Sequence, residues 1–133
     1  MLFTTKTEYG LRAMVALAKS KDSEPLSLSE ISKKEHISQS YLEHLFAKLK
    51  ADDLIVSVRG ANGGYKLART PKQISMFDIV EALEGALAIF QCNSGGGRIS
   101  TCVPGKCLTR KIWQEVQAKT VGTLRKFTLN DLI

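Results

Sequence analysis

The first pattern of apolar and polar positions along the chain is that of an amphipathic helix. In the segment TKTEYGLRAMVALAKS, apolar side chains recur at intervals of three and four residues: Leu11, Met14, Val15 and Ala18. This spacing places them on one face of a helix. Thr5 is followed three residues later by Glu8, the spacing of a capping box, so the helix is expected to begin near Lys6.

Two shorter helices are expected in LSLSEISKKEHISQSYLEHLFAKLKADD. Ser27 and Glu30 form a second capping-box pattern, and His36 with Ile37 interrupts the helix that follows. Ser38 then has the position of an N-cap. The helix after it repeats apolar residues at helical spacing: Leu42, Leu45, Phe46 and Leu49. Two short helices joined by a tight turn make a helix-turn-helix.

The segment LIVSVRGANGGYKLAR has the pattern of a β-hairpin. Its β-branched residues precede a glycine-rich turn over 60–64, after which Tyr65 and Leu67 alternate with Lys66. A hairpin directly after a helix-turn-helix is a wing, and Arg59 beside its tip is suited to a minor groove while the helix from Ser38 occupies the major groove. A small α+β domain with a basic surface is the alternative.

The residues expected to contact DNA lie on the exposed face of the second helix and at the hairpin tip: Ser38, Gln39, Ser40, Tyr41, Glu43, His44, Lys48, Arg59, Gly60, Asn62 and Gly63. Short hydroxyl side chains suit phosphates or base edges, and Glu43 can accept a hydrogen bond from cytosine N4. Glu43 could instead form a cap with Ser40, and His44 could be a solvated surface residue. Lys48 and Lys50 fit phosphate contacts or solubilising charge better than base reading.

A capped helix is expected after Ser75, with Asp78 in its first turn, apolar residues inside and Gly85 at its end. The last 25 residues carry a roughly helical stripe, interrupted by Gly122: Trp113, Val116, Thr120, Leu124 and Phe127. Such a stripe could belong to the core of one chain. After so small a winged domain we expect it to pair with a second copy, which buries Leu124 and Phe127 between the two chains and presents two reading helices to a palindromic operator.

The predicted fold is therefore mainly α with a small β-hairpin wing. We expect a winged helix-turn-helix in residues 1–85, a cysteine-containing loop in 86–108, and a dimerisation helix with a C-terminal tail in 109–133.

Composition narrows the class of partner. The 133 residues, 44% of them apolar, suffice for one modest core, and the formal charge of +6 favours an acidic partner such as nucleic acid. No apolar run approaches the ~18 residues of a membrane span, and no leader pattern is visible, so a cytoplasmic protein without a membrane partner is expected. No nucleophile–base pair or phosphate loop is present, which argues against an enzyme.

All three cysteines, Cys92, Cys102 and Cys107, lie in one segment rich in glycine and polar residues. In a reducing compartment, clustered cysteines more often bind metal or take part in redox chemistry than form structural disulfide bonds. The C-x9-C-x4-C spacing lacks the close pairs of a structural zinc site, which makes zinc a weaker alternative. Nearby cations, Arg98, Lys106 and Arg110, favour deprotonated thiols.

Four motifs carry a resemblance that runs from Met1 to Ile133: TKTEYGLRAM, SQSYLEHLFAKLK, VRGANGGYKLAR and KCLTRKIW. The chain resembles the bacterial winged-helix regulator family that includes the iron–sulfur cluster regulator IscR and the nitric-oxide sensor NsrR, with overall motifs most similar to the IscR branch. The resemblance implies homodimers on double-stranded DNA, with Ser40, Glu43 and His44 facing bases and Arg59 in the minor groove. It also implies a cluster held by Cys92, Cys102 and Cys107.

The sequence departs from the family pattern at the fourth ligand. Arg110 stands where the IscR branch places a ligating histidine, and arginine is permanently protonated. Glu8 is the best candidate, because the NsrR branch supplies a carboxylate at the matching position from the partner subunit; the alternative for Glu8 is the cap with Thr5. His36 and His44 are weaker candidates because both lie in the DNA-reading half.

Three functions remain open. The first is a DNA-binding regulator controlled by an iron–sulfur cluster, with [2Fe-2S] slightly favoured over [4Fe-4S]. The second is a metal-free regulator in which two cysteines form a reversible disulfide. The third is a cluster carrier, for which the expected array of four cysteines is missing.

Overall fold

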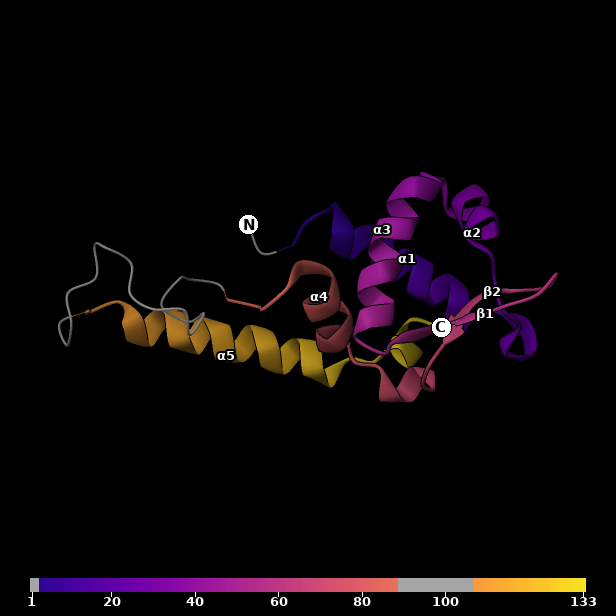
Figure 1. Ribbon diagram of the computed structural model, residues 1–133. Coiled ribbons are helices and arrows are strands. Elements are labelled where there is room, and N and C mark those ends of the chain that lie inside the picture. The colour runs from indigo at the N-terminus through magenta and orange to yellow at the C-terminus, as the bar shows by residue number, and fades with distance from the viewer. Residues whose placement is uncertain (1–2, 89–106) are drawn as a thin grey trace.

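The computed structural model describes residues 3–88 and 107–133. Its helices are α1 (Thr5–Ala18), α2 (Leu28–Glu35), α3 (Gln39–Ala51), α4 (Met76–Glu84) and α5 (Arg110–Lys126), and its strands are β1 (Ile55–Val58) and β2 (Gly64–Leu67). Within these residues, short 3-10 turns lie at Lys21–Ser23, Pro71–Gln73 and Leu129–Leu132. The predicted fold, mainly helical with a hairpin wing, is confirmed (Figure 1).

Helix α1 begins one residue before the expected position, and its cap differs from the expected one. The side chain of Thr4, rather than that of Thr5, accepts a hydrogen bond from the backbone N–H of Lys6. No capping box forms there, so Glu8 is not a capping residue. The expected pairing of Thr5 with Glu8 was wrong because the preceding threonine already satisfies this helix end.

The buried face of α1 also lies partly away from the expected one. Ala13 and Met14 are fully buried, whereas Leu11, Val15 and Ala18 only border the core. The small residues explain the shift, because a methyl group at Gly10 would overlap the side chain of Leu83 on α4. Helix α1 therefore packs on α4 at close range, which a count of large apolar residues does not predict.

The helix-turn-helix forms as expected. Ser27 and Glu30 make a reciprocal capping box, with hydrogen bonds of 2.8 and 3.1 Å. Helix α2 ends at His36, which takes a left-handed conformation. Ser38 caps α3, and the inward face of α3 is buried as predicted: Leu42, Leu45, Phe46 and Leu49.

The wing is an antiparallel hairpin in which Ile55 pairs with Leu67 and Val58 with Gly64. Tyr65 of β2 also makes two backbone hydrogen bonds with Leu26, of 2.9 and 2.8 Å, and so joins the hairpin to the chain just before α2. Gly64 is required at this join: its φ is +153°, and a methyl group there would overlap the carbonyl group of Leu26.

The C-terminal tail returns to the winged unit. Leu129 is fully buried in the core cluster formed by α1, α3, α4 and the hairpin. The backbone of this tail pairs with the chain before and at the start of α4, since Met76 donates to Phe127 and Leu129 donates to Ile74 at 2.9 and 2.8 Å. The expected cap and end of α4, Ser75 with Asp78 and then Gly85, are confirmed.

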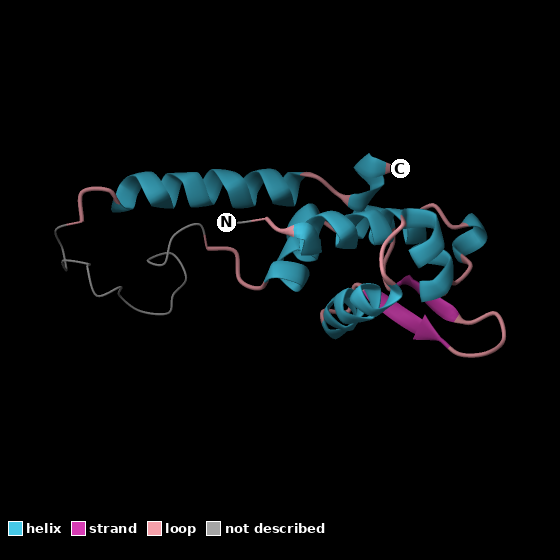
Figure 2. Ribbon diagram, turned by 90° about the horizontal axis from the view of Figure 1, so that it is seen from above, coloured by secondary structure: helices cyan, strands magenta, loops and turns pink. Residues whose placement is uncertain are grey.

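Helix α5 extends away from the winged unit in both ribbon views (Figures 1 and 2). No residue of α5 is fully buried in the described part of the chain. Leu124 packs against this chain's own core, whereas Val116 and Phe127 are 39% and 46% exposed. Leu124 is only partly buried and Phe127 is exposed in the single chain, so the expectation that a second copy covers them stays a prediction. Within the described ranges, none of the helices has the length and hydropathy of a membrane span.

Candidate nucleic-acid interface and cysteine segment

The outward face of α3 carries exposed polar side chains beside its N-terminus. The Ser38 hydroxyl accepts a hydrogen bond from the Tyr41 N–H at 3.2 Å and lies 3.0 Å from the Ser40 hydroxyl. Glu43 and His44 follow on the exposed side of the helix. The cap belongs to Ser38, so Glu43 is available for another partner, and the face presents hydroxyl, carboxylate and imidazole groups in one turn.

Two residues predicted to contact DNA make contacts within the chain. The ring of Tyr41 meets that of Tyr9 edge-on at 5.8 Å, and its hydroxyl lies 3.2 Å from the hydroxyl of Thr5. The ammonium group of Lys48 donates to the backbone carbonyl of Leu83 at 3.3 Å. These side chains connect α3 to α1 and α4, and their contact with DNA stays a prediction.

The structure adds Ala47 to the exposed side of α3 and gives Lys50, also exposed, a partner. Ala47 lies four residues after Glu43, so simple helical spacing places it on the same face. A methyl side chain in that position suits apolar contact with thymine. The ammonium group of Lys50 donates to the Ser57 hydroxyl on β1 at 3.1 Å, a contact between segments that spacing alone cannot reveal.

The hairpin tip is exposed at Arg59, Gly60 and Asn62. Gly60 has a φ of +119°, and the Gly63 N–H donates to its carbonyl at 3.0 Å, which closes the turn. A methyl group at Gly63 would overlap the carbonyl oxygen of Val58. The glycines thus permit a narrow loop that projects from the body of the protein (Figure 2), and Arg59 directly precedes the first of them.

The root of the wing is attached to α3. The rings of Phe46 and Tyr65 meet edge to face at 5.0 Å, with an interplanar angle of 88°. The turn from α3 to β1 is closed by the Leu54 N–H, which donates to the carbonyl of Leu49 at 3.0 Å, and Leu54 itself is buried. The helix and the hairpin therefore form one unit with a polar face on α3 and an arginine on the neighbouring loop.

Of the three cysteines, the described residues include Cys107; Cys92 and Cys102 lie outside them. Cys107 is exposed and stands three residues before α5. A hydrogen bond with the Thr109 hydroxyl, at 3.5 Å, is the main cause that lowers the pKa of the thiol, followed by backbone N–H groups and the charge of Arg110. The site thus eases deprotonation of the thiol to the thiolate, the form that binds soft metals and attacks disulfides.

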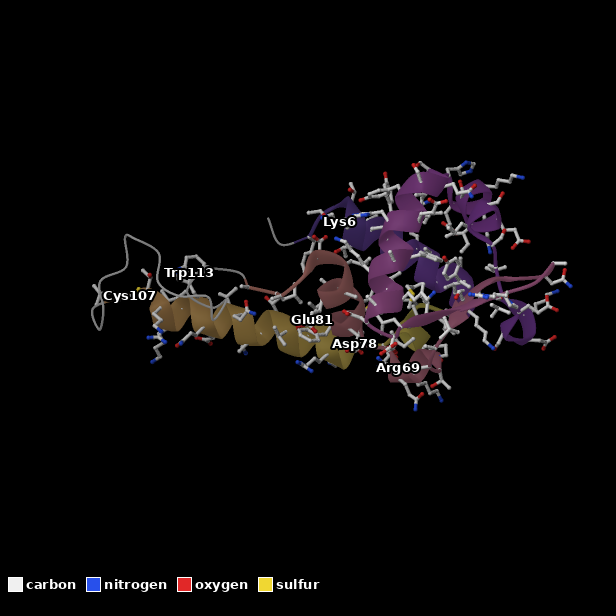
Figure 3. The ribbon with its side chains drawn as sticks, viewed as in Figure 1. Lys6, Arg69, Asp78, Glu81, Cys107 and Trp113 are labelled. Carbon is white, nitrogen blue, oxygen red and sulfur yellow. The ribbon has the colours of Figure 1, made fainter. Side chains whose placement is uncertain are left out.

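Glu8 is exposed on α1, and its carboxylate has no hydrogen-bond or ion-pair partner among residues 3–88 and 107–133. Figure 3 shows Cys107 at the far end of α5 and Lys6, two residues before Glu8, on the winged unit. Within the described ranges, no three His, Cys, Asp or Glu side chains gather as a metal site. His36 and His44 are both exposed on the helix-turn-helix.

Glu84 joins the end of α4 to the start of α1. Its carboxylate accepts hydrogen bonds from the N–H and the hydroxyl of Thr4, at 2.9 and 2.6 Å, and from the hydroxyl of Thr7 at 2.8 Å. Burial alone would raise the pKa of Glu84, but these hydrogen bonds outweigh it and lower the pKa. The chain leaves for the cysteine segment directly after this junction.

Comparison with protein families identifies the chain over residues 3–133 as Rrf2, described as an iron-dependent transcriptional regulator. The HTH-type transcriptional regulator IscR of Cronobacter sakazakii is 36% identical over 134 residues, which cover 100% of this chain and 80% of that protein. The chain belongs to the Rrf2 family of transcriptional regulators. The predicted resemblance is confirmed, and so is the expectation of a regulator rather than an enzyme.

Solved structures agree with this assignment. CymR, the global cysteine regulator of B. subtilis, has a TM-score of 0.80 at 33% identity, over 99% of this chain and 95% of that one. The IscR of T. potens has a TM-score of 0.77 at 34% identity, over 99% of this chain and 85% of that one. The chain is thus similar both to regulators named IscR and to the cysteine regulator CymR.

Proposed function

We propose that this Rrf2-family regulator is a homodimer that binds a palindromic operator in double-stranded DNA, and that an iron–sulfur cluster on the segment from Cys92 to Cys107 controls the binding. The observation that carries the DNA part is the joined unit of α3 and hairpin, with an exposed polar helix face next to a loop that bears Arg59. A bacterial regulator of this kind acts in the cytoplasm.

On DNA, α3 lies in the major groove and the hairpin tip follows the minor groove. Ser40, Glu43 and His44 then face base edges, with Glu43 suited to cytosine N4. Arg59 inserts into the minor groove, where a narrow groove concentrates negative potential. Ser38 and Gln39 at the helix start, together with Asn62, Gly60 and Gly63 at the tip, supply contacts to the phosphate backbone, which position the protein without reading sequence.

The exposed face of α5 supports a dimer. Leu108 lies just before α5 and is 94% exposed, and Ile112 and Val116, in the half of α5 that extends from the winged unit, are 58% and 39% exposed. Apolar side chains at this spacing on an otherwise charged helix favour burial against another helix. A second copy related by a two-fold axis provides that helix and sets the two α3 helices for the two halves of a palindrome.

The donors offered by the chain fit a cluster with mixed ligands. Cys107 is exposed with a lowered pKa, and Glu8 is an exposed carboxylate without a partner in the described part. Because Glu8 and Cys107 lie at separate places in one chain, Glu8 completes the ligand set from the partner subunit. When bound, an iron–sulfur cluster, with [2Fe-2S] favoured, supplies a group that responds to oxidation, nitric oxide or iron supply.

The test is an anaerobic preparation of the full chain. We expect broad visible absorbance near 400–600 nm with matching iron and sulfide, which EPR assigns to one cluster type. Cys92→Ala, Cys102→Ala and Cys107→Ala should each remove the colour, while Glu8→Ala should leave a more labile cluster. Full colour in any one cysteine variant would remove that residue from the ligand set. A duplex selected from a random pool, bound more tightly than its scrambled form at fixed salt, tests the DNA part separately.

A metal-free thiol regulator is the second candidate. The exposed Cys107 with its lowered pKa favours it, because a thiolate is also the nucleophile of disulfide exchange. Structural similarity to CymR, which is named as a cysteine regulator, is compatible with it. A colourless protein whose electrophoretic mobility changes on treatment with a thiol reductant would favour this candidate over the cluster.

A further inference from the structure

Reading two grooves at once requires a fixed relation between α3 and the hairpin. If the hairpin swings relative to the helix, Arg59 leaves the minor groove while α3 stays in the major groove. The contacts that set this relation therefore determine specificity without touching DNA.

Two of these contacts lie on the inner side of the hairpin. The ring of Phe46 contacts the ring of Tyr65 edge to face, and the backbone of Leu26 pairs with the backbone of Tyr65. Both act on β2, the strand that leaves the tip. Strand β1, which leads to Arg59, is held by its ladder with β2 and by the buried residues at its root, Leu54 and Ile55.

The third contact acts on β1 from the solvent side. Lys50, in the last turn of α3, donates from its ammonium group to the hydroxyl of Ser57 at 3.1 Å, and both residues are exposed. Ser57 precedes Arg59 by two residues, which in a strand is about 7 Å. Of the contacts described, this one meets the hairpin nearest to the arginine on that strand.

We propose that Lys50 is a positioning residue that holds β1 against the recognition helix through Ser57, and that it is not primarily a phosphate contact. The inference rests on the proposed DNA-binding function. A lysine that neutralises a phosphate strengthens binding to every sequence equally. A lysine that sets the hairpin strengthens binding only where both grooves fit, so it contributes to specificity.

The chemistry of the pair supports this role. The ammonium group has three donors and the Ser57 hydroxyl is a good acceptor, so the bond forms without removing either group from water. Such a bond contributes modestly, and its loss corresponds to about a 2–10-fold change in an equilibrium constant. The effect is therefore measurable in affinity while the fold remains stable.

The experiment compares Lys50→Met, Ser57→Ala, the double variant and Lys50→Arg with the wild type. Lys72→Met is the matched control, because it removes one exposed lysine from the 3-10 turn at Pro71–Gln73, away from the α3–β1 contact. The probes are a duplex selected from a random pool by the wild type and a scrambled duplex, both at fixed salt. Thermal unfolding of each variant confirms that it folds.

We expect each single change to weaken binding to the selected duplex about 2–10-fold and to leave the scrambled duplex unaffected. The double variant should be no weaker than either single one, because the two residues act through one bond. Lys50→Arg should retain most of the preference, since arginine also donates to the hydroxyl. Lys72→Met should show no loss of preference.

A different result overturns the proposal. Equal loss on both duplexes in Lys50→Met, with a salt dependence reduced by about one phosphate contact and a silent Ser57→Ala, would make Lys50 a phosphate ligand. If the wild type binds the selected and the scrambled duplex equally, the proposed function fails. NMR order parameters of the β1–β2 amides in the free protein then test separately whether Lys50 positions the hairpin. They should fall in Lys50→Met and Ser57→Ala relative to Lys72→Met, and unchanged values would refute it.

Discussion

Replacement of Leu129 by alanine tests whether the C-terminal tail belongs to the winged unit. The side chain of Leu129 is 0% exposed. The backbone N–H of Leu129 donates to the carbonyl of Ile74 at 2.8 Å, which fixes the tail at this position. Loss of a fully buried leucine side chain typically lowers the free energy of unfolding by about 3–5 kcal/mol. For a chain of this size that corresponds to a fall of roughly 10 °C or more in Tm.

Leu132 is the matched control, because it lies in the same short turn and is 47% exposed. Leu132→Ala should cost less than about 1 kcal/mol. Denaturant unfolding followed by circular dichroism measures both variants, at one protein concentration because a dimer is stabilised by mass action. Equal costs for the two leucines would refute the reasoning and place the tail outside the core.

The remaining predictions concern the DNA-binding surface, the dimer and the dependence of stability on pH. Arg59→Ala should weaken binding to a selected duplex by about 1–3 kcal/mol in a titration at fixed salt without a change in Tm, and unaltered affinity would remove Arg59 from the interface. Ile112→Asp with Val116→Asp should give monomers in analytical ultracentrifugation, whereas Gln114→Asp on the same helix should remain dimeric. Glu84, whose pKa is lowered in the folded protein, should stabilise the fold at pH values above the ordinary glutamate pKa and lose this contribution as the pH falls through its folded pKa. Glu84→Gln should flatten this part of the curve of stability against pH. Parallel curves for the variant and the wild type would contradict the role of Glu84 at the junction.

Local signals in the sequence predicted the helix-turn-helix and the wing, because the physics that determines them is local. The boxes at Ser27–Glu30 and Ser75–Asp78 satisfy helix N–H groups within three residues. Glycines permit the hairpin turn. The burial of Leu129 could not be predicted in the same way, since it depends on where α5 directs the tail. Which face of α1 is buried depends on the close approach of Gly10 to Leu83.

The sequence predicted which face of α3 is exposed, but not the contacts of individual side chains on it. Spacing placed Ser40, Glu43 and His44 on the exposed side of α3, and the structure agrees. Spacing could not show that Tyr41 and Lys48, at the border of that face, are engaged with α1 and α4, because partners distant in the sequence decide the direction of a long side chain. Predictions for Cys92 and Cys102 fall outside the described residues.

The arrangement of the core limits how a signal at the cysteines can act on DNA. The described core is closed by α1 to α4, the hairpin and Leu129, and Cys107 is exposed at the opposite end of α5. The reading face of one chain is therefore complete without the thiol chemistry. In the proposed dimer, a cluster or a disulfide then has to act on the relation between the two DNA-binding units, and it is a switch only if the two dimer geometries differ in affinity for DNA. Cluster-free protein should accordingly still bind DNA. Its affinity or its preferred half-site spacing should change, whereas its base preference within a half-site should not. A selection with and without the cluster distinguishes these outcomes, and a change of preferred bases inside one half-site would show that the signal reaches α3 itself.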